Sequence, residues 1–187
     1  ISAPLSPEKL LDRKMPAVNG QTIQGTPIDS AYFEGKVTLI NFMLLGCPYC
    51  MAELKTLAQL QMNLKGQSDF QILCIAPHTA AQLLEFNSSN PSGMASIRRY
   101  YKLDSITYEI LPECAQERSG KKTNGDVIVR PECKVISRPF KVDGYPLTLL
   151  VDRQSVIRTV YNGYNPADTS MPGKMQAQIE HLLAQTQ

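Results

Sequence analysis

A buried strand that leads directly into a cysteine-bearing helix constrains the fold of this chain more than any other feature. Residues 37–45 form a short apolar run rich in Val, Ile and Leu, which is typical of a buried strand. The motif Cys47-Pro48-Tyr49-Cys50 follows, and proline suits the first helical position because the N–H there has no intrahelical partner. Leucines then recur at helical spacing. The sequence therefore predicts a strand–helix unit with both cysteines in the first helical turn.

This placement gives the two cysteines different chemistry. A thiolate is the nucleophile in disulfide exchange, and the positive end of a helix dipole favours the anion over the thiol. We expect Cys47, at the open end of the helix, to attack a disulfide, and Cys50, one turn deeper, to resolve the mixed disulfide. Cys47 and Cys50 would then form a redox-active disulfide. The alternative, two buried cysteines that merely lie close together, is weaker because Cys-X-X-Cys directly after a strand is a specific signal.

Length and charge narrow the class of protein. A chain of 187 residues suits a single domain, which we expect over 1–187 with residues 1–15 as an N-terminal arm. The formal net charge of +2 gives no reason to expect a nucleic-acid partner. No apolar stretch approaches the ~20 residues that a membrane helix needs, although a signal peptide or anchor could lie upstream of Ile1. We expect no metal and no cofactor.

The remaining cysteines indicate the compartment. Cys74 lies in an apolar, strand-like run and is expected to be a small buried hydrophobe. Cys114 and Cys133 occupy matching Pro-Glu-Cys triplets, and we expect them to form a structural disulfide that closes a loop of ~20 residues and stabilises the fold by roughly 3 kcal/mol. Structural disulfides persist in oxidising compartments. The chain is therefore expected to be periplasmic or otherwise exported.

The order of the other elements indicates an α/β fold. Residues 70–76 form a second strand parallel to the first, and Thr79 followed by Gln82 predicts a capping box that starts a helix. Further helices are expected around 94–101 and from 172 onward, and strands at 147–152 and 155–161 form an antiparallel pair.

Two regions stand apart from this pattern. Residues 105–142 alternate apolar and polar positions around a polar stretch, which predicts an inserted β-rich segment closed at its base by Cys114 and Cys133. Residues 16–33 contain the turn signal Asn19-Gly20 and predict a short hairpin or an extended lead-in.

At this point the chain resembles the thioredoxin superfamily, and within it the TlpA/ResA-like thiol–disulfide proteins related to AhpC/TSA. The resemblance rests on an apolar strand that leads into the Cys-Pro-Tyr-Cys motif, on Glu53 three residues after the second cysteine, and on the proline-led strand 145–152. It covers roughly 16–104 and 143–185. The resemblance implies a thioredoxin-like fold, with a central mixed sheet flanked by helices, to which 105–142 is added.

The resemblance also implies a second wall for the dithiol. Pro146 would be cis and would lie against the cysteines, and the backbone of Tyr145 would offer a strand-like edge to a protein substrate. The implied activity is disulfide exchange with cysteine-containing proteins and with a redox partner protein. The Pro-Tyr dipeptide between the cysteines matches that of glutaredoxins, whose potentials lie at about −200 to −230 mV. The chain has no Trp, and Met43 replaces the tryptophan that the family carries before its motif.

Three other functions share features with this chain. A peroxiredoxin-like peroxidase would need Thr or Ser at position 44 and Pro at position 40, where the sequence has Leu44 and Ile40. A Sco-like copper chaperone would need its cysteines one residue further apart and a downstream histidine, for which His78 and His181 are the candidates. In a substrate-recruiting module, residues 105–142 would carry the main contacts and the dithiol would be secondary.

Overall fold

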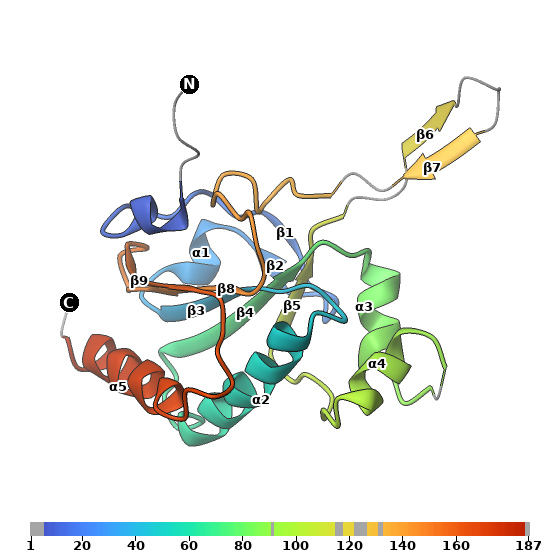
Figure 1. The fold of residues 1–187 in the computed structure, drawn as a ribbon. Helices are drawn as coiled ribbons and strands as arrows, with labels where there is room; N and C mark the ends of the chain where they lie inside the picture. Colours follow the sequence, from blue (N-terminus) through green and yellow to red (C-terminus); the bar gives the residue numbers. More distant parts are fainter. Residues whose placement is uncertain (1–5, 91, 115–117, 122–126, 131–132, 186–187) are drawn as a thin grey trace.

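A five-stranded mixed sheet forms the centre of the computed structural model, which describes residues 6–90, 92–114, 118–121, 127–130 and 133–185. The strands lie in the order β5-β4-β3-β8-β9. Their bounds are Val37–Phe42 for β3, Phe70–Ala76 for β4, Glu109–Pro112 for β5, Leu147–Val151 for β8 and Ile157–Asn162 for β9. This sheet and the helices around it confirm the predicted α/β fold class (Figure 1).

The helices form where the local signals place them. Their bounds are Ser30–Phe33 for α1, Pro48–Asn63 for α2, Ala80–Asn87 for α3, Met94–Tyr100 for α4 and Met171–Ala184 for α5. At the start of α3, the Thr79 side chain accepts a hydrogen bond from the Gln82 N–H, and the Gln82 side chain accepts one from the Thr79 N–H. The predicted capping box is therefore confirmed. The helix α1 was not predicted, because a single turn capped by Asp29 leaves no periodic pattern.

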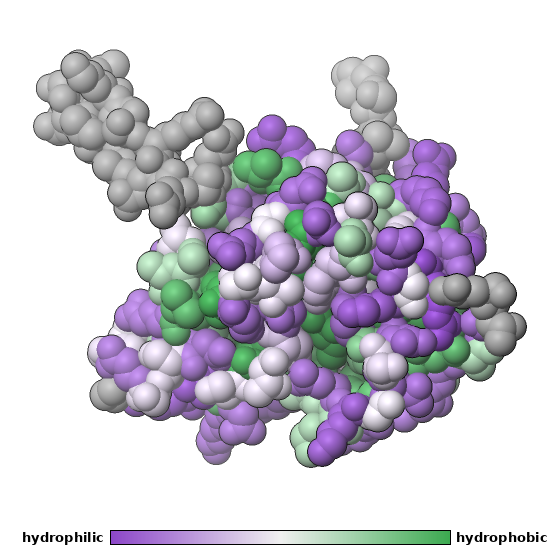
Figure 2. All heavy atoms as spheres, turned by 180° about the vertical axis from the view of Figure 1, so that it is seen from behind, coloured by the Kyte–Doolittle hydropathy of each residue, from purple (hydrophilic) through white to green (hydrophobic). Residues whose placement is uncertain are grey.

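Apolar side chains pack on both faces of the sheet. Along β3, Leu39 belongs to the cluster beneath α2 and α5, whereas Ile40 belongs to the cluster on the opposite face, beneath α1. This alternation follows from the two-residue period of a strand that is buried on both sides. The outer surface is different: on the face opposite to that of Figure 1, hydrophilic residues cover most of the molecule and hydrophobic ones form small separate patches (Figure 2).

The topology brings several strand ends to one edge of the sheet. Strands β3, β4 and β5 run parallel, so their carboxyl ends meet at the same edge. Strand β8 runs antiparallel to β3, with Leu147 opposite Phe42, so its first residue lies at that edge too. The cysteine motif after β3 and the proline before β8 therefore meet, although about 100 residues separate them. We call this edge the dithiol edge.

The inserted segment is shorter than predicted. Residues 109–112 were assigned to the insertion, but they form β5, which pairs in parallel with β4 at the margin of the central sheet. Its alternating pattern fits either place, and Pro112 is tolerated because β5 is an edge strand. Beyond it, β6 (Arg118–Lys121) and β7 (Val127–Arg130) form an antiparallel hairpin that projects from the body of the molecule (Figure 1). Residues 122–126, which belong to the polar stretch of the insertion, lie outside the described residues.

The N-terminal region is more closely attached than an arm. A 3₁₀ turn, η1, spans Pro7–Leu10, and the Asp12 N–H donates to the Ile157 carbonyl at the start of β9. Lys14 forms a bridge with Val156. The lead-in to β3 contains the small hairpin of β1 (Gly20–Gln21) and β2 (Pro27–Ile28), as predicted. Within the part of the chain that the structure describes, no helix is long and apolar enough to cross a membrane.

Candidate active site: a dithiol at a helix N-terminus

Cys47 caps the helix that carries the motif. It is the N-cap residue of α2, and its Sγ accepts a hydrogen bond from the Cys50 N–H at 3.4 Å. Pro48 takes the first helical position, as predicted. The loop between β3 and α2 turns at Gly46, whose φ of +82° lies in the left-handed region that favours glycine. Strand, turn and helix together place the Cys47 sulfur where a first-turn N–H group points.

The chain segment before β8 forms the second wall of the site. The Tyr145–Pro146 peptide bond is cis, and the Cys47 thiol lies 3.8 Å from the Tyr145 carbonyl oxygen, to which it donates. Leu44 and Tyr49 stand on either side of Cys47 in the sequence, and they are 38% and 57% exposed. The half-buried sulfur of Cys47 therefore faces a backbone carbonyl, and two large exposed side chains lie within three positions of it in the sequence.

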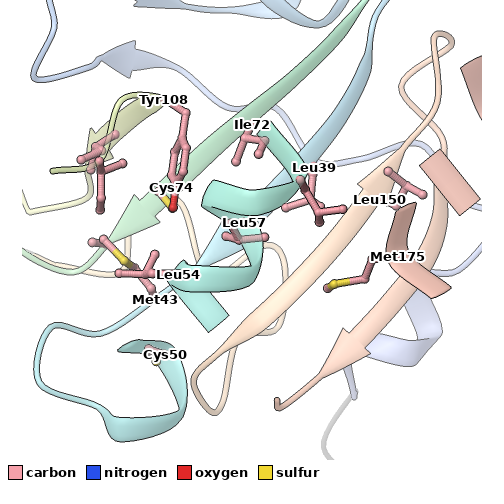
Figure 3. Packing of buried hydrophobic residues seen from close by; sticks show 14 of the residues in the cluster. Leu39, Met43, Cys50, Leu54, Leu57, Ile72, Cys74, Tyr108, Leu150 and Met175 are labelled. Carbon is pink, nitrogen blue, oxygen red and sulfur yellow. The ribbon is translucent and has the colours of Figure 1, made fainter. Parts of the chain in front are cut away.

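Cys50 lies in a different environment. It is buried beneath the first turn of α2 and belongs to the core cluster on that face of the sheet (Figure 3). Burial raises the pKa of the Cys50 thiol, and the hydrogen bond with Cys47 raises it further. The structure has both cysteines as free thiols. One member of the pair is thus accessible to a partner and the other is protected.

A row of polar side chains is buried behind the dithiol. Asn41 on β3 lies opposite Cys74 on β4 and opposite Thr148 on β8, so the three residues form one row across the sheet on the face that α2 covers. Asn41 Nδ2 donates to Thr148 Oγ1 at 2.8 Å, and the Cys74 thiol donates to Asn41 Oδ1 at 3.3 Å. Such a row satisfies its own hydrogen-bonding groups within an otherwise apolar layer.

Glu53 of α2 completes this row from above. Its two carboxylate oxygens accept hydrogen bonds from Asn41 Nδ2 and from the Thr148 hydroxyl, each at 2.8 Å, and the side chain is 1% exposed. Burial raises the pKa of Glu53 to about 7, although the two hydrogen bonds act in the opposite direction. The sequence offered two signals for this cluster, an asparagine inside an apolar strand and a glutamate on the apolar face of a helix.

Cys74 is the third free cysteine and has no disulfide partner among the described residues. It is fully buried, and the hydroxyl end of Tyr108 points toward it (Figure 3). Burial raises the pKa of the Cys74 thiol and also that of Tyr108. This placement agrees with the prediction that Cys74 is a small buried hydrophobe, and its thiol also donates to Asn41.

Cys114 and Cys133 are joined by a disulfide bond across 19 residues of sequence. Cys114 follows β5, and its N–H donates to the carbonyl of His78, which follows β4. The bond therefore lies at the dithiol edge and closes the base of the β6–β7 hairpin. This pairing is the one that the matching triplets indicated.

The residues that a copper chaperone would need do not come together. His78 lies at the dithiol edge, where burial lowers its pKa, whereas His181 lies on α5 and contacts Gln185. Among the described residues, no group of three or more His, Cys, Asp and Glu side chains is arranged to hold a metal ion. The peroxidase positions are also unsuited, since Ile40 is buried within β3 and Leu44 carries no hydroxyl.

Comparison with known proteins supports the family resemblance that the sequence motifs indicated. A model described as the AhpC/TSA family matches residues 11–174. No curated protein matches the sequence.

Several solved structures share the fold. A Chlorobium tepidum protein assigned as the thiol:disulfide interchange protein DsbE has a TM-score of 0.60 and 16% identity, over 91% of this chain and 96% of that one. The thioredoxin domain of a Bacteroides vulgatus thiol-disulfide oxidoreductase has a TM-score of 0.58 and 15% identity, over 92% and 97%. A secreted Mycobacterium tuberculosis disulfide oxidoreductase homologous to E. coli DsbE has a TM-score of 0.53 and 20% identity, over 95% and 100%.

Proposed function

The chain belongs to the AhpC/TSA family, and we propose that it is a thiol–disulfide oxidoreductase that exchanges disulfides with cysteine-containing proteins. One observation carries the proposal. The half-exposed sulfur of Cys47 accepts a hydrogen bond from a backbone N–H at a helix N-terminus and faces the Tyr145 carbonyl. Cys50 is buried one helical turn behind Cys47. The fold that the chain shares with disulfide oxidoreductases supports the same function.

The proposed reaction has two steps. The Cys47 thiolate attacks one sulfur of a client disulfide, which forms a mixed disulfide and releases the other client sulfur as a thiolate. Cys50 then attacks the Cys47 sulfur, which forms the Cys47–Cys50 disulfide and releases the second client sulfur. The client gains two electrons, and the two protons of the dithiol end on its two sulfurs. The reverse sequence oxidises a client, so the redox partner protein determines the direction.

The wall before β8 suits an extended client segment. Pro146 is buried and has no N–H, so the carbonyl of Tyr145 is the backbone group that this wall presents to the dithiol. Leu44 and Tyr49, which flank Cys47 in the sequence, are exposed large hydrophobic residues. We propose that Tyr145 and Pro146 align the segment around the client cysteine, so that its sulfur meets Cys47 in line.

Substitution of the nucleophile tests this function. Reduction of insulin by the purified protein, driven by a dithiol reductant, should fall to the uncatalysed rate in Cys47→Ser, because a hydroxyl cannot form the mixed disulfide. Cys74→Ala is the matched control, because Cys74 is the free cysteine that lies outside the Cys-X-X-Cys motif and is fully buried. This variant should retain turnover. Full activity of Cys47→Ser would contradict the proposal.

We also propose a periplasmic or otherwise exported location. The Cys114–Cys133 bond supports it, because structural disulfides are rare where cellular thiol systems keep cysteines reduced. Peptide mapping of the protein isolated from its cells without reduction should recover the two cysteines as one linked peptide. Free thiols at both positions would contradict an oxidising location.

A further inference from the structure

The helix α2 and the chain segment 145–148 are joined by hydrogen bonds at two places. At the N-cap of α2, the Cys47 thiol donates to the Tyr145 carbonyl. Six residues later, Glu53 Oε1 accepts a hydrogen bond from the Thr148 hydroxyl at 2.8 Å. Among the described residues, no other side-chain hydrogen bond joins this helix to this segment.

The two elements have nearly the same length between these contacts. The six residues from Cys47 to Glu53 rise by ~9 Å along a helix, and the three residues from Tyr145 to Thr148 span ~10 Å along a strand. Both elements also run away from the dithiol edge, because α2 connects the parallel strands β3 and β4, and β8 is antiparallel to β3. A contact at the far end therefore influences the spacing at the dithiol.

Apolar packing alone does not define this spacing. Leu54 and Leu57 of α2 belong to the core cluster beneath the helix, and apolar contacts of this kind have no preferred direction. The Glu53 carboxylate differs, because its oxygens accept hydrogen bonds from Asn41 on β3 and from Thr148 on β8, each at 2.8 Å. Hydrogen bonds to an ionised group are strong and geometrically specific. Together they define one position of α2 relative to two neighbouring strands.

Thr148 lies close to the end of β8 that meets the dithiol. It is fully buried two residues after Pro146, and its hydroxyl accepts a hydrogen bond from Asn41 Nδ2 and donates to Glu53. The ladder between β3 and β8 begins only at Leu147, so the wall before β8 has no ladder partner on β3. The position of the wall therefore depends on contacts further along β8, and the Thr148 hydroxyl is the one that reaches α2.

We propose that Thr148 is a positioning residue for the client-binding wall formed by Tyr145 and Pro146. Bonded to Glu53, its hydroxyl sets the spacing between the Tyr145 carbonyl and the Cys47 sulfur. The proposal rests on the proposed function and extends it to a buried residue outside both the dithiol motif and the wall. A displaced wall misaligns an extended client segment, whereas a small disulfide that does not lie along the wall still reaches Cys47.

Substitution of Thr148 by valine removes the hydroxyl and keeps the β-branched shape of the side chain. We expect Thr148→Val to raise KM for insulin about fivefold and to change kcat less than about twofold, because the lost contact acts on client binding. The rate at which Cys47 attacks hydroxyethyl disulfide should change less than about twofold. An unchanged KM for insulin would overturn the proposal.

Two controls separate the hydroxyl from general damage to the core. Thr148→Ser keeps an O–H group for Glu53 and should return KM to within about twofold of the wild-type value. Thr56 is a second buried threonine, on α2 itself, and its hydroxyl pairs with the Tyr164 hydroxyl at 2.7 Å rather than with a strand of the sheet. Thr56→Val should leave KM unchanged. An equal increase in either control would overturn the positioning role.

A second measurement is independent of turnover. The infrared absorption of the protonated Glu53 carboxyl group is isolated as the difference between each protein and its Glu53→Gln variant. Loss of the Thr148 donor should raise the pKa of Glu53 from about 7 by about one pH unit. The groups that interact electrostatically with Glu53 are Cys50, Cys74 and Tyr108, and burial raises the pKa of each, so they keep their protons during the titration. An unchanged titration would overturn the proposal.

The outcomes separate this proposal from the proposed function. Absent turnover of insulin by wild type would overturn the proposed function, and the role of the wall with it. Turnover by wild type that Thr148→Val matches at every insulin concentration would overturn the positioning role alone.

Discussion

Two pairs of cysteines lie at the same edge of the sheet, and their surroundings differ. Cys47 and Cys50 are free thiols at the start of α2, where an N–H points at the outer sulfur. Cys114 and Cys133 are bonded and join the two ends of an inserted hairpin. In the first pair, the outer sulfur accepts an N–H from the helix and is accessible to a partner, and the inner sulfur is buried. The second pair connects two segments on either side of the insertion. The position of each pair in the fold therefore determines whether it suits disulfide exchange or structural support.

Loop length explains why the second pair is the stabilising one. Closing a loop across 19 residues removes much more freedom from the unfolded chain than closing the two-residue gap between Cys47 and Cys50. The first pair should therefore open and close with a smaller effect on the stability of the fold. We expect the largest differences between the pairs in turnover, and smaller ones in stability.

Substitution of Cys50 should give the largest effect. In Cys50→Ser the mixed disulfide between Cys47 and a client has no internal thiol to resolve it, so turnover stops after the first step. Non-reducing electrophoresis should show a covalent complex with insulin, and a dithiol reductant should cleave that complex. Cys47→Ser is the control and should form no complex. A complex formed through Cys114 or Cys133 would remove the distinction between the two pairs.

Substitution of the structural pair should act on stability. We expect Cys114→Ser combined with Cys133→Ser to lower the free energy of unfolding by about 3 kcal/mol, because the unfolded chain regains the entropy of an open loop. Urea denaturation of the double variant and of wild type measures the difference. Reduction of wild type should reproduce it. A variant as stable as wild type would mean that other contacts at the insertion base already hold its ends.

Glu53 should give the stability of the molecule a pH dependence. Its pKa is raised to about 7 in the fold and is about 4.3 in an unfolded chain, so the folded state holds the proton more tightly. The resulting stabilisation is complete below about pH 4.3 and is lost as the pH rises to about 7, by up to about 4 kcal/mol.

The difference in unfolding free energy between wild type and Glu53→Gln isolates this contribution, because a glutamine does not titrate. We expect wild type to lose stability relative to the variant between about pH 4.3 and 7, and the difference to be constant above about pH 8. A difference that is flat across this range would show that Glu53 titrates in the fold as it does in water.

Much of this fold is local enough to be predicted. The strand before the motif, the proline at the first position of α2 and the Thr79 capping box each depend on a few neighbouring residues. The strand β5 was misplaced for a physical reason. Alternation shows that one face of a strand is buried, but not which sheet buries it, and the pairing of Ala76 with Pro112 joins residues 36 positions apart.

The polar parts of the site were the least accessible to prediction. The row of Cys74, Asn41 and Thr148 exists only because two pairings, one parallel and one antiparallel, bring these residues into register. The contact between Glu113 and the Ser137 N–H spans 24 residues and depends on the path of the insertion. A buried polar residue in an apolar run signals that a partner exists, but the partner is identified by the fold.

Cys74 provides the smallest and most specific test of the comparison between the pairs. It lies at neither a helix N-terminus nor a loop base, and its thiol donates to Asn41 Oδ1 within the core. We expect Cys74→Ala to lower the free energy of unfolding by about 1 kcal/mol, because Asn41 loses a donor. Cys74→Ser keeps an O–H donor at this position and should lose less. Equal losses in urea denaturation would mean that Cys74 contributes packing alone, and the thiol would then have no part in holding Asn41 beneath Glu53.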